Sequence, residues 1–164
     1  MKRFSMAVTL AGTLAVGVSA AAGTGSQPVG IQERAQGAAQ VVVATVAETT
    51  ARYERNEFGD ELIITYAKLA VEEAIKGTAD EKTLSLEGGT VEGITLRVSD
   101  LPALSKGERA VFFLKQKGNG TFEPHLRGQG ILKLDERDHV RGSSLTLDEV
   151  RRMARSGAEH GGDR

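Results

Sequence analysis

The sequence has no cysteine and no tryptophan, and its 164 residues include only 3 histidines and 3 prolines. The absence of cysteine excludes a disulfide framework, a thiolate nucleophile and an iron–sulfur cluster. Three histidines leave little material for a histidine-based metal site. The formal net charge of −1 argues against a surface built to neutralise many phosphate groups. What is present, 40% hydrophobic and 26% charged residues, is typical of a globular domain with short appendages.

The N-terminus has the three parts of a secretory signal peptide. Lys2 and Arg3 form a positive start, an apolar stretch follows at 6–18, and small residues come next. This stretch is shorter than the roughly 20 residues that span a bilayer, so we expect cleavage near Ala20 or Ala22 and no membrane anchor afterwards. Residues 1–22 are thus interpreted as a signal peptide. Since secreted eukaryotic domains of this size commonly rely on disulfides, the lack of cysteine favours a bacterial periplasm or medium.

The mature chain divides into four parts. Residues 23–39 contain few large apolar side chains, so we expect a flexible lead. Residues 40–140 alternate apolar runs with glycine-containing turns, which is typical of a β-rich domain. Residues 141–157 are interpreted as a helical segment, and the polar end at 158–164 as a disordered tail.

Two apolar runs predict the core strands. The β-branched run at 41–46 is typical of a strand that is buried on both faces or closes a barrel. The run at 110–114, with Phe112 and Phe113, predicts a central strand with at least one ring fully buried. Further strands are expected at 83–87, 94–98, 121–126 and 131–134, of which 94–98 has the cleanest two-residue alternation.

The segment 62–75 fits two structures. Tyr66, Leu69 and Ala74 recur at helical spacing, and the composition favours helix. Ile63 and Thr65, however, begin a strict alternation that fits a strand equally well. Periodicity alone leaves both open.

The end of the chain predicts a helix. Thr146 and Glu149 have the spacing of a capping box, and Gly157 is interpreted as the stop. A face of apolar residues would pack on the domain. Arg151, Arg152 and Arg155 are interpreted as a solvated outer face rather than as a contact for a polyanion, because no aromatic residues accompany them.

A series of short segments is spread over about residues 40–135: Val41-Val42-Val43, Ile64-Thr65, Glu73-Ala74-Ile75-Lys76-Gly77, Gly88-Gly89, Leu101-Pro102, Gly107-Glu108, Phe112-Phe113-Leu114 and Gly128-Gln129-Gly130. Their order is an apolar first strand, a Thr-bearing second strand ending in Lys-Gly, a Gly-Gly turn, a Gly-Glu turn and an aromatic-Leu strand. In this order the chain resembles a group of exported bacterial small β-barrel domains.

That group is OB-like and broadly similar to the netrin-like modules of metalloproteinase inhibitors. The resemblance implies a mainly β fold, a small closed five- to six-stranded OB-like barrel with one C-terminal α-helix. It also implies that Ile63 to Val71 form a long second strand, with a bend near Glu72-Glu73 before Ile75 returns to the core. The inhibitors use an N-terminal cysteine to ligate zinc, and this chain has none, so that mode of inhibition is not implied. Gln40 also stands where an acidic residue is common.

Motifs for catalysis or metal binding are not found. His125 and His139 lack the spacing that places two ligands on one helical face, and the serines lack a nucleophile elbow. The Gly-Gly turn at 88–89 precedes no predicted helix, so it forms no phosphate cradle. We therefore expect no enzyme activity, no cofactor and no metal.

The sequence predicts an exported, non-catalytic binding or interaction module whose partner is an envelope or extracellular protein. Its recognition surface would come from the loops at 51–60 and 88–93, because loops on a rigid barrel are where recognition usually resides. The candidate binding residues are Arg52, Tyr53, Arg55 and Phe58. The alternatives are an OB-type binder of oligosaccharide or nucleic acid, for which Tyr53 and Phe58 would be the stacking platform, and an envelope hydrolase. The negative mature charge argues against nucleic acid.

Overall fold

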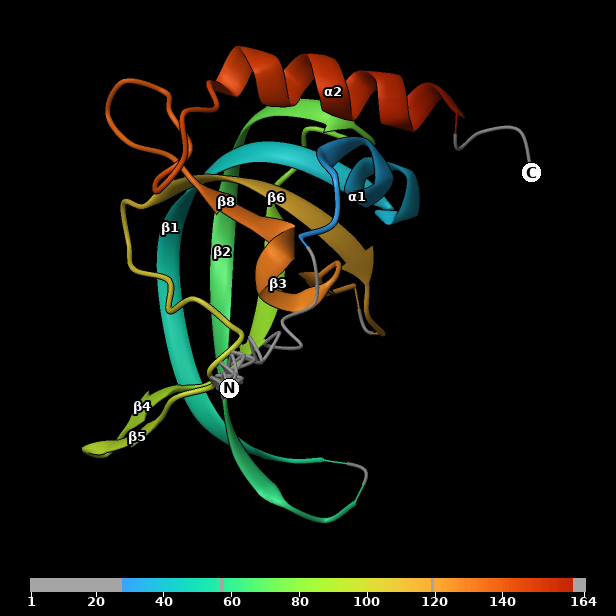
Figure 1. The fold of residues 1–164 in the computed structure, drawn as a ribbon. Coiled ribbons are helices and arrows are strands. Elements are labelled where there is room, and N and C mark those ends of the chain that lie inside the picture. The colour runs from blue at the N-terminus through green and yellow to red at the C-terminus, as the bar shows by residue number, and fades with distance from the viewer. Residues whose placement is uncertain (1–27, 57, 119, 161–164) are drawn as a thin grey trace, which may run out of the picture.

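The computed structural model describes residues 28–56, 58–118 and 120–160, and the predicted signal peptide lies outside them, as do residues 23–27 and 161–164. Figure 1 shows the arrangement of its elements. In chain order these are α1 (Ile31–Gly37), β1 (Gln40–Arg55), β2 (Glu61–Lys76), β3 (Lys82–Glu87), β4 (Gly89–Val91), β5 (Ile94–Leu96), β6 (Arg109–Gln116), β7 (Phe122–Pro124), the 3-10 helix η1 (Arg127–Gly130), β8 (Ile131–Lys133) and α2 (Leu147–His160).

The fold is mainly β, with the predicted C-terminal helix present. Six strands form one sheet in the order β1-β2-β3-β7-β6-β8. β1 also pairs with β6, so the sheet returns on itself as a ring. β4 and β5 form a separate hairpin that projects from the ring (Figure 1). The long β1–β2 hairpin continues beyond the ring on the side away from α2, and its tip belongs to the candidate site.

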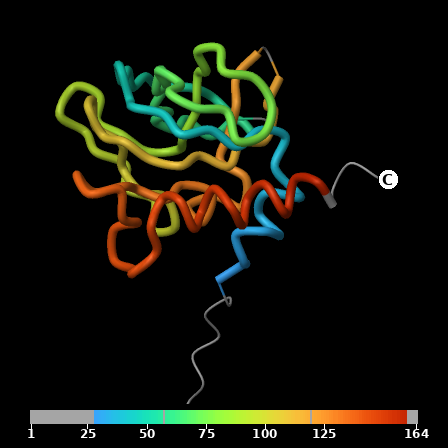
Figure 2. Tube along the Cα trace, turned by 90° about the horizontal axis from the view of Figure 1, so that it is seen from above, coloured from blue at the N-terminus to red at the C-terminus, as the bar shows by residue number. Residues whose placement is uncertain are grey.

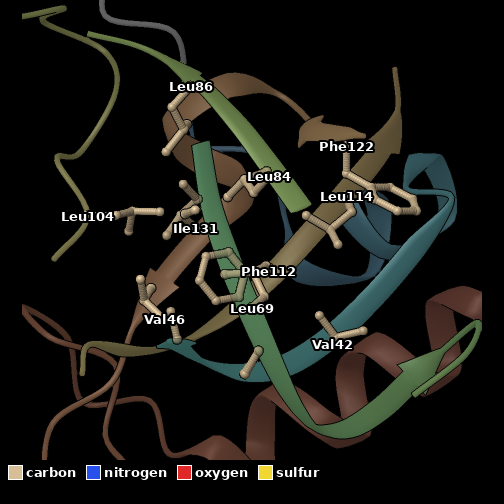
Figure 3. Close-up of a cluster of buried hydrophobic side chains, with 13 residues drawn as sticks. Val42, Val46, Leu69, Leu84, Leu86, Leu104, Phe112, Leu114, Phe122 and Ile131 are labelled. Atoms are coloured by element: carbon tan, nitrogen blue, oxygen red, sulfur yellow. The ribbon is translucent and has the colours of Figure 1, made fainter. Parts of the chain in front are cut away.

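The first part of β1, residues 41–46, is buried on both faces, as its β-branched run predicts. Val42 and Val46 face a cluster inside the ring, together with Phe112 of β6 (Figure 3). Val41 and Val43 point outward into a second cluster, which α1 and α2 cover from one side of the strands (Figure 2). Since neighbouring residues of a strand point to opposite faces, one run of valines supplies both clusters.

The ambiguous segment at 62–75 is a strand, contained in β2. Its pairing with β1 is interrupted where Val43 faces Glu73 and Ala44 faces Val71, so Glu72 is an extra residue on the β2 side. Such a bulge bends a strand, and it lies where the bend was predicted. The expected strand at 94–98 is shorter than predicted: β5 ends at Leu96, and Ile94 is 60% exposed.

The expectation of a flexible lead is wrong for its second half, because residues 31–37 form α1. Ile31, Arg34 and Ala35 of this helix are buried, and Ile31 and Ala35 belong to the apolar cluster that α2 shares. Gly157, interpreted above as a helix stop, lies inside α2, where a Cβ atom would come within 2.3 Å of the Gln32 carbonyl oxygen of α1. The missing side chain thus lets the two helices approach closely, and this contact orders the lead.

Two cations hold α1 in place, one from the sheet and one from α1 itself. The Lys76 ammonium at the end of β2 donates to the carbonyls of Ala35 at 2.9 Å and Ala38 at 2.7 Å, at the C-terminal end of α1 where carbonyls lack helical partners. The buried Arg34 side chain donates to the carbonyls of Val29 at 2.7 Å and Gln129 at 2.6 Å. Burial lowers the pKa of Arg34 from its ordinary value.

The capping box of α2 is confirmed. The Thr146 backbone N–H donates to the Glu149 carboxylate at 2.8 Å, and the Glu149 N–H donates to Thr146 Oγ1 at 3.3 Å. The helix continues to His160, so the predicted disordered tail is wrong for 158–160. The interpretation of Arg151 and Arg155 as a solvated face is also incomplete, because both donate to the Glu73 carboxylate of β2, at 2.7 and 2.9 Å.

Candidate functional site

The loop at the tip of the β1–β2 hairpin is shorter than predicted. Arg52, Tyr53 and Arg55 lie on β1 itself, which ends at Arg55, so only the following turn matches the expected loop at 51–60. Asn56 shapes this turn, because its Oδ1 accepts hydrogen bonds from the N–H groups of Phe58 at 3.0 Å and Asp60 at 2.8 Å. These bonds hold Phe58 at the tip, where it is 81% exposed.

The four predicted site residues do not form one surface. The Arg52 guanidinium lies 4.5 Å from the centroid of the Tyr66 ring and 2.6 Å from the Glu54 carboxylate. The Tyr66 hydroxyl also donates to Glu54 at 2.7 Å, and this bond holds the pKa of the Glu54 carboxyl below its ordinary value. Arg52 is thus engaged within its own sheet. Tyr53, its neighbour along the strand, points to the opposite face.

Arg55 and Phe58 line a hollow of about 940 Å³, here called the β3–β7 groove. It opens between the hairpin tip, the end of β3, and β6 with β7. Its apolar lining comes from Phe58, Leu62, Ile64, Leu86, Leu101, Pro124 and Leu126. A concave surface with apolar lining and a few polar groups at its rim is the usual form of a binding site.

Positive charge is in excess around this groove. Its three acidic residues are each engaged by a cation: Glu54 by Arg52, Glu87 by Arg127 at 3.0 Å and Glu123 by Lys115 at 3.6 Å. Arg55 forms no ion pair with an acidic residue among the described residues, and the Lys117 ammonium donates to the Ser85 hydroxyl at 3.3 Å and is near Glu54 without forming an ion pair with it. The Arg55 and Lys117 side chains are therefore the cations of the groove that could form ion pairs with a ligand.

Arg127 closes one end of the groove. Its guanidinium donates to Asp100 as well as to Glu87, so it joins η1, the loop before β6 and the end of β3. These bonds to carboxylates raise the pKa of Arg127. The Gly128 N–H also donates to the Asp100 carbonyl at 3.0 Å. The wall is thus held by charged side chains and by backbone together.

His125 lines the groove beside α1. A Cβ atom on Gly37 would come within 2.4 Å of His125 Nε2, so the ring packs closely on the end of the helix. Burial lowers the pKa of His125, which keeps the ring neutral at physiological pH. His139 lies elsewhere, in the turn that precedes α2, where its Nδ1 is 3.8 Å from Asp135. Across the described residues, no group of three or more histidine, aspartate or glutamate side chains is arranged to hold a metal ion.

No model of a known protein family matches the chain, and a search of curated proteins finds no match either. None of the helices in the part of the chain that the structure describes is long and apolar enough to cross a membrane. The site is therefore interpreted from its own residues.

The second predicted loop, at 88–93, belongs to a different hollow. This space of about 700 Å³, here called the β4–β5 pocket, lies over the face of the β1–β2 hairpin and is lined by Thr49, Thr65, Gly89 and Leu104 among others. Gly89 has a φ of +135°, and a Cβ there would come within 2.3 Å of Thr65 Oγ1. The two hollows meet at Leu86, Glu87 and Leu101.

Sequence reasoning missed Lys117 and Arg127. Neither belongs to a motif, and they reach the groove only because the ring places β7 beside β3, which precedes it by more than thirty residues. A local pattern carries no signal for such a pairing. Of the four predicted residues, Arg55 and Phe58 line the groove, and both belong to or border a polar turn that can be recognised from the local sequence.

Proposed function

We propose that this protein is an exported, non-catalytic binding module that recognises a protein partner through the β3–β7 groove. The observation that carries this proposal is Phe58, an aromatic side chain held almost fully in solvent at the rim of an apolar groove. Phe58 and the apolar lining of the groove form one surface, and contiguous exposed apolar surfaces mark interaction sites in soluble proteins. The Asn56 hydrogen bonds fix the turn beforehand, which reduces the entropy lost when a partner binds.

The fold supports the same proposal. The ring of strands is consistent with a small closed OB-like barrel, and with the resemblance to exported bacterial and netrin-like modules. Export follows from the charged, apolar and small-residue parts of residues 1–22, so the partner would be an envelope or extracellular protein. N-terminal sequencing of protein from the envelope or medium tests export: a start near Ala21 or Gly23 supports it, and a start at Met1 contradicts it.

The alternatives have less support from the site. A binder of single-stranded nucleic acid or oligosaccharide would stack its ligand on neighbouring aromatic rings. Phe58 lines the groove, but Tyr53 does not, and Arg52 already covers Tyr66. A hydrolase would use acidic groups that are free to exchange protons. The carboxylates of the groove are instead engaged by cations.

Site-specific photocrosslinking tests the proposal. Phe58 is replaced by p-benzoylphenylalanine, the exported protein is irradiated in envelope extract of its source, and crosslinked peptides are identified by mass spectrometry. Ile94 on β5 provides the matched control, because it is also an exposed apolar residue but lines neither hollow. We expect a discrete crosslinked partner from position 58 and none from position 94. Equal crosslinking from both positions, or none from position 58, contradicts the proposal.

A further inference from the structure

We propose that the β3–β7 groove binds an extended peptide strand that pairs with the open edge of β3 and carries acidic side chains on one face and apolar side chains on the other. This inference rests on the proposed function and specifies the class of partner. The shortest strand pairing of the ring is the one between β3 and β7. β3 pairs with β2 over six residue pairs, from Ile64 with Glu87 to Leu69 with Lys82, but it meets β7 only through Leu84 and Phe122.

The direction of the backbone groups on β3 follows from one hydrogen bond. The Gly88 N–H donates to the Ile63 carbonyl at 2.7 Å, which extends the β2–β3 register by one pair. In an antiparallel ladder, alternate residues exchange both of their hydrogen bonds with the partner strand. Leu84 and Leu86 therefore direct their backbone groups at β2. Ser85 and Glu87 direct theirs away from β2, toward β7 and the groove.

Pro124 explains why the pairing of β3 with β7 ends after one residue pair. The His125 N–H donates to the Phe113 carbonyl at 2.7 Å, which continues the β6–β7 register, so Phe122 and Pro124 direct their backbones away from β6, toward β3. The next bond of the parallel ladder would run from the N–H of residue 124 to the Ser85 carbonyl. Proline has no N–H. The strands separate at this point, and the groove lies between their ends.

An added strand would supply the missing donor. The Ser85 carbonyl and the Glu87 N–H and carbonyl are oriented as they would be for a neighbouring strand, and addition of an extended peptide to such an edge is a recurring mode of recognition. Main-chain hydrogen bonds give such complexes affinity, whereas side chains on the two faces of the added strand give specificity.

The two faces of the added strand would contact different kinds of side chain, apolar on one face and cationic on the other. On the inner face, Leu86 and Leu101 line the groove, which favours apolar side chains. On the outer face, Lys117 contacts the Ser85 hydroxyl and Arg55 lies at the rim, and neither forms an ion pair within hydrogen-bond distance in the described part of the chain. Alternation of apolar and acidic residues satisfies both faces, because side chains alternate along a strand.

Defined peptides test this inference. The probe is an acetylated, fluorescein-labelled peptide of alternating valine and glutamate, about six residues long so that it exceeds the exposed edge of β3. Its binding to the exported protein is measured by fluorescence anisotropy. A peptide with lysine in place of glutamate is the charge control. Two further peptides carry N-methyl groups, one on every valine and the other on every glutamate, and so each blocks the donors of one strand edge.

We expect the valine–glutamate peptide to bind, the lysine peptide to bind at least about tenfold more weakly, and only one of the two N-methylated peptides to lose binding. The double variant Arg55→Gln/Lys117→Gln should weaken binding about tenfold. The matched control Lys106→Gln/Arg152→Gln, which removes two exposed cations that line neither hollow, should leave it unchanged.

The outcomes separate this inference from the proposed function. If both N-methylated peptides bind as well as the parent, strand addition is wrong. If the lysine peptide binds as tightly as the glutamate peptide, the acidic preference is wrong. If no peptide binds while position 58 still crosslinks to a partner, the inference fails and the proposed function stands. If position 58 gives no crosslink and no peptide binds, both fail.

Discussion

The Lys82 ammonium lies 2.6 Å from the Asp80 carboxylate, although the Lys82 side chain is only 1% exposed and that of Asp80 is 66% exposed. Lys82 begins β3 and faces Leu69 across the ladder, so its stem fills one end of the ring beside Phe122, whose ring centroid is 5.8 Å from the Nζ atom. The Thr78 hydroxyl is 3.1 Å from the same Nζ. A buried cation thus depends on two residues of the preceding turn.

We expect Asp80→Asn to destabilise the protein more than Lys82→Met. The first substitution leaves a buried ammonium without its carboxylate, whereas the second replaces the cation with an apolar chain of similar length. Thermal unfolding followed by circular dichroism at neutral pH provides the measurement. Lys82→Met should unfold at the temperature of the unaltered protein or above it. The reverse order of the two variants would show that the ion pair does not support the buried lysine.

The same pair predicts a dependence on pH. Hydrogen bonds from Lys82 and then Thr78 lower the pKa of Asp80 to about 2, below the value near 3.8 of an unperturbed aspartate. A carboxyl with a lowered pKa stabilises the fold above its ordinary pKa, and this stabilisation is lost as pH falls from about 4 to about 2. The loss of unfolding temperature over that range should be smaller in Lys82→Met. An equal loss in both proteins would assign it to other carboxylates.

Phe112 and Phe113 are both fully buried, so the expectation of at least one buried ring is met twice. They point to opposite faces of β6, one into the cluster inside the ring and the other into the cluster beneath the helices. Each substitution to alanine should therefore cost about 3–5 kcal/mol of unfolding free energy, measured by urea denaturation. Ile94→Ala, at an exposed position, is the control and should stay within about 0.5 kcal/mol. A loss below about 1 kcal/mol for either phenylalanine would contradict its place in the core.

Much of this core could be predicted from the sequence because it is encoded locally. A run of β-branched residues at β1 and an apolar run at β6 are buried in any compact arrangement that pairs them. The capping box of α2 is equally local. Segment 62–75 could not be assigned from periodicity, because its helix and strand patterns were equally good, and pairing with β1 and β3 decides it.

α1 could not be predicted because its stability is tertiary. A helix of 7 residues is too short to form alone, and its sequence has one large apolar residue, Ile31. It exists because Gly157 lets it approach α2 and because Lys76 binds its last carbonyls. The candidate site is tertiary in the same way: Arg55 and Phe58 line the β3–β7 groove and Arg52 and Tyr53 do not, because β3, β6 and β7 decide where the groove lies along the hairpin.

Glu73 connects α2 to the sheet, and its loss should loosen the helix. Its carboxylate accepts hydrogen bonds from Arg151 and Arg155, and it is only partly exposed. We expect Glu73→Gln to lower the unfolding free energy by about 1 kcal/mol and to speed amide hydrogen exchange in α2. Arg152→Gln, a charge change on the exposed side of the same helix, is the control. Exchange that accelerates equally across the strands would show global destabilisation instead of local loosening.

Substitution of Phe58 should weaken binding without lowering the stability of the fold. Its ring is almost fully in solvent, and the turn is held by the Asn56 side chain and not by the ring, so Phe58→Ala should change the unfolding free energy by less than about 0.5 kcal/mol. A few anchoring side chains carry most of the binding energy of an interface, and we expect Phe58 to be one, so the same variant should weaken capture of the partner identified by crosslinking at least about tenfold. Tyr53→Ala is the matched comparison, because Tyr53 is also exposed, at 37%, but lies outside the groove. It should leave binding unchanged. Equal losses of binding in the two variants would place recognition on the hairpin as a whole, and a large loss of stability in Phe58→Ala would show that the ring supports the fold.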